Sequence, residues 1–142
     1  MASGIYNIFK YGCFAGKYDM EEDSPSDVFK VALMDDNHSF VKANNSWAEI
    51  SANELPAAGN YATGGAIITG QAITKGDTTK FDGSDVSWAN ATFSAYHAVV
   101  YNDSSATKEL VASIDFGGVK TVAAGTFTIQ WNAAGILTIT EA

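Results

Sequence analysis

Apolar and polar residues alternate along the last third of the chain. Phe127, Ile129 and Trp131 fall on one side of an extended backbone, and the polar residues between them fall on the other. A period of two is what a strand with one buried face requires. Residues 132–135 read Asn-Ala-Ala-Gly, a turn sequence, and a second alternating run follows. The pattern predicts a closing β-hairpin over residues 125–140.

The same alternation upstream predicts further strands over residues 27–34, 66–74, 78–81, 85–88, 92–101 and 109–116. Gly70 is expected to interrupt one of them. The longest run carries apolar residues on both faces, with odd positions from Phe93 to Tyr101 on one face, so it is predicted to be a central strand. Residues 109–116 are predicted to be its antiparallel neighbour, with Leu110, Ala112, Ile114 and Phe116 pointing inward. A helical turn is expected within residues 47–55, and short strands between frequent turns are typical of a sandwich or barrel.

The N-terminal segment has a different period. Ile5, Ile8, Phe9 and Cys13 recur at spacings of three and four, which predicts a short amphipathic helix within residues 4–20. Ser3 or Asn7 could cap its start. The alternative is an arm that becomes ordered only on a partner. An acidic connector over residues 19–26 contains Pro25 and precedes the strands.

We therefore predict a mostly β protein. Residues 1–26 are expected to form the N-terminal helix or arm with the acidic connector, and residues 27–142 a single antiparallel β-sandwich or barrel-like domain. The 142 residues suit one domain, and 46% hydrophobic residues are enough to form a core.

Charge narrows the classes of partner. The chain has 16 acidic residues, eight lysines and no arginine, for a formal net charge of −8. Binders of nucleic acid carry a basic stripe, and anionic membranes attract basic segments, so we expect neither partner. Cys13 is the only cysteine, so no intrachain disulfide can form. Because no secretory signal or long apolar run is visible, we expect a soluble protein made in the cytoplasm.

Few residues suggest chemistry. Asp35, Asp36 and His38 could offer metal ligands, but the full calcium-loop pattern is missing, so we expect a solvated hairpin turn. His97 lies within a predicted strand, where a hydrogen-bonded sheet histidine is expected, although Asp115 could approach it from the neighbouring strand. Cys13 is interpreted as a small packing residue. We predict no catalytic residue, no metal site, no cofactor and no enzymatic activity.

Several motifs together carry a resemblance to a known family. They are Tyr6-Asn7-Ile8-Phe9-Lys10, Phe29-Lys30-Val31-Ala32-Leu33, Ile50-Ser51-Ala52-Asn53-Glu54-Leu55, residues 59–66, residues 81–92, Ala98-Val99-Val100-Tyr101, Ile114-Asp115-Phe116-Gly117 and residues 125–137. In this order they resemble a group of small tailed-bacteriophage virion structural proteins. The resemblance implies a capsid decoration (cement) protein that binds the major capsid protein, or a tail-associated protein. It implies no catalytic residues.

The N-terminal aromatics are the predicted partner-binding residues: Tyr6, Phe9, Tyr11 and Phe14. Such a surface is too apolar to stay exposed on a lone monomer, so we expect it to pack under the β-domain or to dock on a neighbour. We expect a homo-oligomer located on the virion. Deleting residues 1–20 is then expected to leave a folded β-domain that no longer joins the particle.

Two other functions stay open at the level of sequence. The first is a tail or fibre component that contacts host glycans through the Gly59–Gly65 and Asn102–Thr107 loops. The second is a glycan hydrolase, since any two carboxylates could converge in space.

Overall fold

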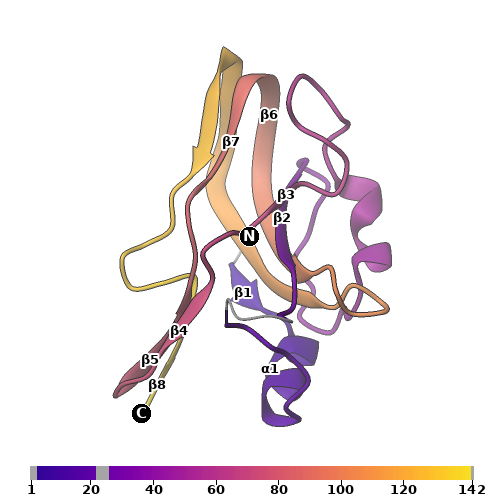
Figure 1. Cartoon of the computed structure of the whole chain (residues 1–142). Helices are drawn as coiled ribbons and strands as arrows, with labels where there is room; N and C mark the ends of the chain where they lie inside the picture. Colours follow the sequence, from indigo (N-terminus) through magenta and orange to yellow (C-terminus); the bar gives the residue numbers. More distant parts are fainter. Residues whose placement is uncertain (1–2, 22–25, 142) are drawn as a thin grey trace.

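The computed structural model describes residues 3–21 and 26–141, and it is mostly β with one α-helix near the N-terminus (Figure 1). The strands form two antiparallel sheets. The larger has the strand order β1-β7-β6-β2-β3, from strands Gly4–Ile5, Leu110–Ile129, Val86–Asn102, Phe29–Met34 and Ala66–Ile67. The smaller has the order β4-β5-β8, from Ala72–Thr74, Thr78–Asp82 and Leu137–Thr140. The helix α1 spans Asn7–Phe14. The predicted mostly β fold with an N-terminal helix is confirmed.

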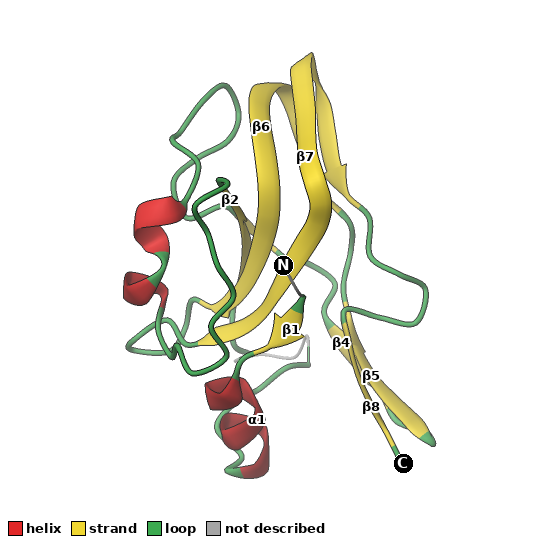
Figure 2. Ribbon diagram, turned by 180° about the vertical axis from the view of Figure 1, so that it is seen from behind, coloured by secondary structure: helices red, strands yellow, loops and turns green. Residues whose placement is uncertain are grey.

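Both faces of the large sheet are covered around β2 and the paired parts of β6 and β7 beside it, whereas residues 117–126 of β7 are mostly exposed (Figure 2). One face packs against the small sheet through a core cluster that includes Phe29, Leu33 and Phe81. The other face is covered by residues 40–50, which contribute Phe40, Trp47 and Ile50. Two short 3-10 helices confirm the predicted helical turn: η1 (Trp47–Glu49) lies in this covering segment and η2 (Ser51–Asn53) follows it. As predicted, β6 is the central strand, and it pairs with β7.

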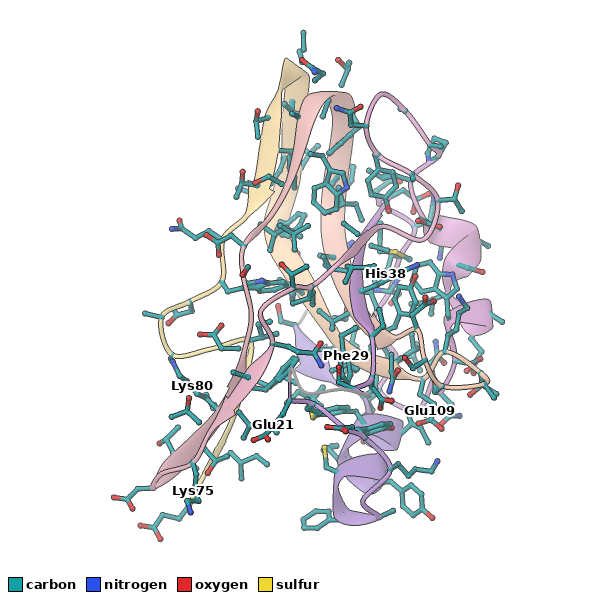
Figure 3. The ribbon with its side chains drawn as sticks, in the orientation of Figure 1. Glu21, Phe29, His38, Lys75, Lys80 and Glu109 are labelled. Atoms are coloured by element: carbon teal, nitrogen blue, oxygen red, sulfur yellow. The ribbon has the colours of Figure 1, made fainter. Side chains whose placement is uncertain are left out.

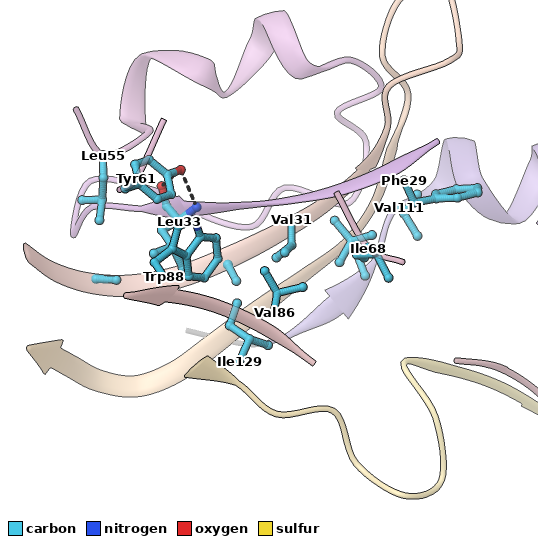
Figure 4. Close-up of a cluster of buried hydrophobic side chains, with 14 of the residues drawn as sticks. Phe29, Val31, Leu33, Leu55, Tyr61, Ile68, Val86, Trp88, Val111 and Ile129 are labelled. Carbon is cyan, nitrogen blue, oxygen red and sulfur yellow. Dashed lines mark hydrogen bonds between the residues drawn. The ribbon is translucent and has the colours of Figure 1, made fainter. Parts of the chain in front are cut away.

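The larger cluster contains one polar anchor (Figure 4). Tyr61 is buried between Leu55 and Trp88, and its hydroxyl accepts a hydrogen bond of 2.9 Å from the backbone N–H of Leu33. The same hydroxyl lies 2.9 Å from a carboxylate oxygen of Glu54, to which it donates. A buried donor or acceptor that loses its partner costs about 1–3 kcal/mol. Tyr61 therefore fixes the segment after η2 against the central part of the large sheet.

β6 and β7 are longer than the sequence predicts. Residues 85–88 and 92–101 belong to one strand, and β7 joins residues 109–116 to the run that starts at residue 125. The pairing register shifts at four places, one of them between Ala95 and His97. Asn90 and Ala124 adopt positive φ beside two of these irregularities. Bulges bend a ribbon without ending it, which is why turn-prone residues inside the strands suggested breaks.

The predicted closing hairpin is wrong. Ile129 ends β7 in the large sheet, whereas β8 pairs with β5 in the small sheet. The intervening turn is real, since the N–H of Gly135 donates to the carbonyl oxygen of Asn132 over 2.8 Å. The next N–H, from Ile136, donates to Phe81 and so directs the chain to the other sheet. Alternation identified both strands but not their partners.

The strand predicted over residues 66–74 is divided into β3 and β4. Gly70 separates them with a φ of 62°, as the sequence suggested. Just before β3, Gly65 has a φ of 73° and lies against β2. A Cβ atom at this position would meet the carbonyl oxygen of Val31 at 2.0 Å. The close approach of these two backbones is possible only without a side chain at residue 65.

The N-terminal segment joins the large sheet instead of standing apart from it. Gly4 and Ile5 pair with Ser113 and Ala112, and α1 follows at once. The N-cap is Tyr6, without a side-chain capping bond, so the predicted caps are wrong. Ser3 instead accepts a hydrogen bond from the N–H of Asp115. Residues 22–25 of the predicted acidic connector, including Pro25, lie outside the described residues.

Candidate functional site

The base of α1 is fixed by backbone bonds and by aromatic packing. The N–H of Tyr6 donates to Val111 and that of Asn7 to Lys42, over 3.0 and 2.9 Å. The Tyr6 ring is fully buried and meets Phe40 edge-on, with ring centroids 5.0 Å apart. Phe9 is only 6% exposed and stacks on Tyr18. Two of the four predicted partner-binding residues, Tyr6 and Phe9, therefore belong to the protein's own core.

The other two predicted residues lie on the surface. Phe14 is 97% exposed and Tyr11 is 61% exposed. The ammonium group of Lys17 lies 5.5 Å from the centre of the Tyr11 ring and 3.0 Å from a carboxylate oxygen of Glu109. Glu109 lies beside α1 in Figure 3, at the start of β7. We call Tyr11 and Phe14 the outer face of α1; it is an aromatic surface held by a rigid base.

An apolar groove separates α1 from the small sheet. Its volume is about 510 Å³, and its lining residues are Ile5, Phe9, Lys10, Cys13, Phe14, Met20 and Leu137 to Thr140. Figures 1 and 2 place α1 and the free end of the small sheet at the same end of the molecule. Cys13 is exposed on this wall, so its interpretation as a packing residue is wrong. Partial burial in the groove raises the pKa of the thiol, which lowers its reactivity.

A second hollow lies where β7 leaves the large sheet. It has a similar volume of about 510 Å³, and it is lined by aromatic residues (Phe116, Phe127 and Trp131) and by polar ones, including Lys120, Gln130 and Asn132. The indole N–H of Trp131 donates to the carbonyl oxygen of Ser84 over 3.0 Å, which fixes the ring. Hollows of 300–1,000 Å³ that combine aromatic walls with a few polar groups suit small ligands. The sequence does not predict this hollow, because the strand expected over residues 109–116 continues as β7 to Ile129.

The two histidines form a buried pair. His97 is a hydrogen-bonded sheet histidine, as predicted: its Nδ1 lies 3.3 Å from the carbonyl oxygen of Asp35. Its Nε2 lies 3.8 Å from a carboxylate oxygen of Asp115, so that carboxylate does approach. His38 packs edge-on against His97, with ring centroids 5.2 Å apart. Its Nε2 lies 3.0 Å from the hydroxyl of Ser113, and both residues are buried.

Because His38 is buried, the prediction of a solvated hairpin turn at residues 35–38 is wrong for this residue. Asp36 and Asn37 do form an exposed turn, in which Asp35 accepts a bond from the N–H of Asn37. β2 does not return directly as a hairpin. Among the described residues, no cluster of three or more His, Cys, Asp or Glu side chains is arranged to hold a metal ion.

The burial of His38 predicts acid sensitivity. Burial and the nearby His97 lower the pKa of His38 from 6.5 to about 4, against the opposite effect of Asp35. The unfolded chain therefore takes up a proton at this residue before the folded chain does, and the free energy of unfolding falls between pH 6.5 and 4. The shift corresponds to a total loss of roughly 3 kcal/mol. Urea unfolding at pH 7, 5.5 and 4.5 measures it.

His38→Gln is the comparison for this prediction. Its free energy of unfolding should depend less on pH over the same range, whatever its value at pH 7. The carboxyl pKa of Asp103 is lowered by Lys108 and Lys30, so Asp103 contributes mainly at lower pH. An imidazole NMR titration that places the pKa of His38 between 6 and 7 in the folded protein would contradict the expectation.

The two loops proposed for glycan contact are well packed. Gly64 donates its N–H to Glu54 over 2.6 Å, and Tyr61 is buried, so residues 59–65 are not a flexible loop. In the other loop, the side chain of Asn102 accepts bonds from two backbone N–H groups. Asp103 there forms ion pairs with Lys30 and Lys108. The polar groups of these two loops already form bonds within the protein, so the aromatic hollow is the better candidate for a ligand site.

No protein-family model matches the chain, and no curated protein or solved structure matches it at a significant level. Within residues 3–21 and 26–141, no helix has the length and apolar character needed to cross a bilayer.

Proposed function

We propose that the chain is a non-enzymatic structural protein of a tailed-bacteriophage virion, namely a capsid decoration protein that binds the shell of the major capsid protein. The observation that carries the proposal is the outer face of α1, where Tyr11 and Phe14 are exposed on a rigid base. Exposed aromatic side chains close together mark sites of protein interaction. The resemblance of the sequence motifs to virion proteins supports the same function.

The anchoring of α1 suits binding at many equivalent sites. A helix whose base is already ordered loses little conformational entropy when its exposed side chains dock. Symmetry then multiplies a small contact over the shell, and self-association of the bound copies adds to the effect. A net charge of −8 is compatible with a protein on the outside of a shell, away from the packaged nucleic acid. The protein would be made in the host cytoplasm and located on the virion.

Tyr11→Ser and Phe14→Ser are expected to weaken binding to the particle by about tenfold or more each. Docking of a large aromatic side chain contributes roughly 1.5–3 kcal/mol, and 1.4 kcal/mol corresponds to a factor of ten. Binding of purified variants to particles that lack the protein measures the loss. Val119→Ser is the control, because Val119 is an exposed apolar residue on β7, 48% accessible, outside α1.

Full binding by both α1 variants would contradict the role of the outer face. The location itself is tested separately, by counting copies on the particle. Hundreds of copies would support a capsid protein, whereas a handful would support the tail.

The aromatic hollow favours a second candidate function. A tail- or fibre-associated protein that contacts host glycans needs flat aromatic rings beside amide groups, and Trp131, Gln130 and Asn132 supply both. A low copy number together with glycan binding that Trp131→Ala abolishes would favour this function over the capsid.

A further inference from the structure

The small sheet has an apolar face that extends beyond the core. Its register places five side chains on one face: Ile73, Thr79, Phe81, Leu137 and Ile139. Phe81 is buried in the core cluster, and Leu137 is half-buried beside it. Further along the same strand, Ile139 is 70% exposed. This apolar face therefore continues out of the core into solvent.

The exposed part of this face forms one wall of the groove, opposite α1. Leu137 and Ile139 line one side, and Cys13 and Phe14 line the other. In Figure 3, the labels Lys75 and Lys80 identify the small sheet, which lies beside α1. The groove is thus the open end of the sandwich: its inner part is closed by Phe9, and no layer formed by residues 3–21 or 26–141 covers its outer part.

β8 also has an open edge at this groove. It is the last strand in the order β4-β5-β8, so within the described part of the chain its backbone pairs with a neighbour on one side only. Its sequence, Leu-Thr-Ile-Thr, contains neither a charge nor a proline. Proteins usually protect a strand edge with such residues, and an edge without them is a template for another strand.

We propose that a second copy of the chain binds at this groove and at the open edge of β8. The two β8 strands would pair antiparallel about a two-fold axis and join the small sheets into one six-stranded sheet. A two-fold axis perpendicular to the sheet keeps both apolar faces on the same side, so Ile139 of each copy covers the groove of the other.

Charge favours a second copy as the occupant. Among the described residues that line the groove, Lys10 is the only charged one. Glu141 directly follows β8 and is exposed. Pairing of the β8 strands would bring this carboxylate toward Lys10 of the partner copy. The pairing therefore joins an apolar face to an apolar groove and a carboxylate to an ammonium group.

This inference deepens the proposed function, since it names the surface for self-association, but it is tested in solution without particles. Sedimentation velocity of the full chain over a range of about 1–100 μM is expected to show a dimer. Ile139→Lys, which places a charge at the interface between the two copies, should be monomeric at every concentration in this range. Val119→Lys should dimerise like the wild type. Because Ile139 is exposed, circular dichroism should show the same fold for all three proteins.

Hydrogen exchange of the wild type provides a measurement that needs no variant. The backbone amides of residues 137–140 should exchange more slowly at high protein concentration than after dilution. A wild type that is monomeric at 100 μM, or a dimer that Ile139→Lys leaves intact, would overturn the inference. Particle binding that depends on Tyr11 could still hold in either case, so the two proposals fail separately.

Discussion

A chain that lacks residues 1–20 is expected to lose its fold at 25 °C or to retain only marginal stability. The deletion removes β1 from the large sheet, and it removes the buried rings of Tyr6 and Phe9 from the core. Each buried side chain of this size contributes about 1.5–3 kcal/mol, against a net stability of about 5–15 kcal/mol for a domain. This result is the opposite of the one that the sequence alone predicts. Urea unfolding monitored by circular dichroism measures it.

The matched control for the deletion is Phe14→Ser in the full chain. Since Phe14 is almost fully exposed, its replacement should change the free energy of unfolding by less than about 0.5 kcal/mol. An unchanged unfolding midpoint in the shortened chain would mean that the N-terminal segment is not part of the core. A loss of particle binding after the deletion could be caused by unfolding alone. The same loss in Phe14→Ser, which is expected to stay folded, would show that the exposed ring takes part in binding.

Gly65→Ala is expected to destabilise the protein by roughly 2–5 kcal/mol, from the sum of backbone strain and overpacking. Residue 65 has positive φ, and the new methyl group would meet the backbone of β2 at Val31, which cannot move without disturbing the central pairs of the sheet. Thermal and urea unfolding measure the effect.

Gly117→Ala separates the effect of backbone strain from that of overpacking. Gly117 has nearly the same φ, 71°, but a Cβ atom there meets no neighbour within 4 Å. Its replacement should therefore cost only the conformational part, about 1–2 kcal/mol. Equal losses at the two positions would show that the approach of residue 65 to β2 is looser than described.

The alternating pattern predicted which residues form strands, but it could not predict which strands pair. β8 has the pattern of a hairpin arm, yet its partner is β5, about 60 residues earlier in the chain. Bulges also moved side chains between faces. Val99 and Tyr101 share one cluster, but Ala95, which has the same parity, lies in the other, because the register shifts after Ala95. Period alone does not reveal such a shift.

The candidate site, too, could be predicted from the sequence only in part. The sequence identified an aromatic helix, but the pattern of apolar residues does not distinguish a ring that packs inside the protein from one that faces a partner. Phe9 and Phe14 lie on one helix of eight residues and have opposite environments. The groove could not be predicted at all, since its walls come from the two ends of the chain.

The pairing of β1 with β7 also constrains how the protein is made. Ile5 pairs with Ala112, so β1 must wait until β7 has been synthesised before the large sheet can close. Contacts so distant in sequence slow folding, because the chain must close a long loop before they form. During that time the aromatic side chains of the N-terminal segment are unburied and available to chaperones or to other nascent copies. The large sheet is therefore expected to be completed only after β7 has been synthesised.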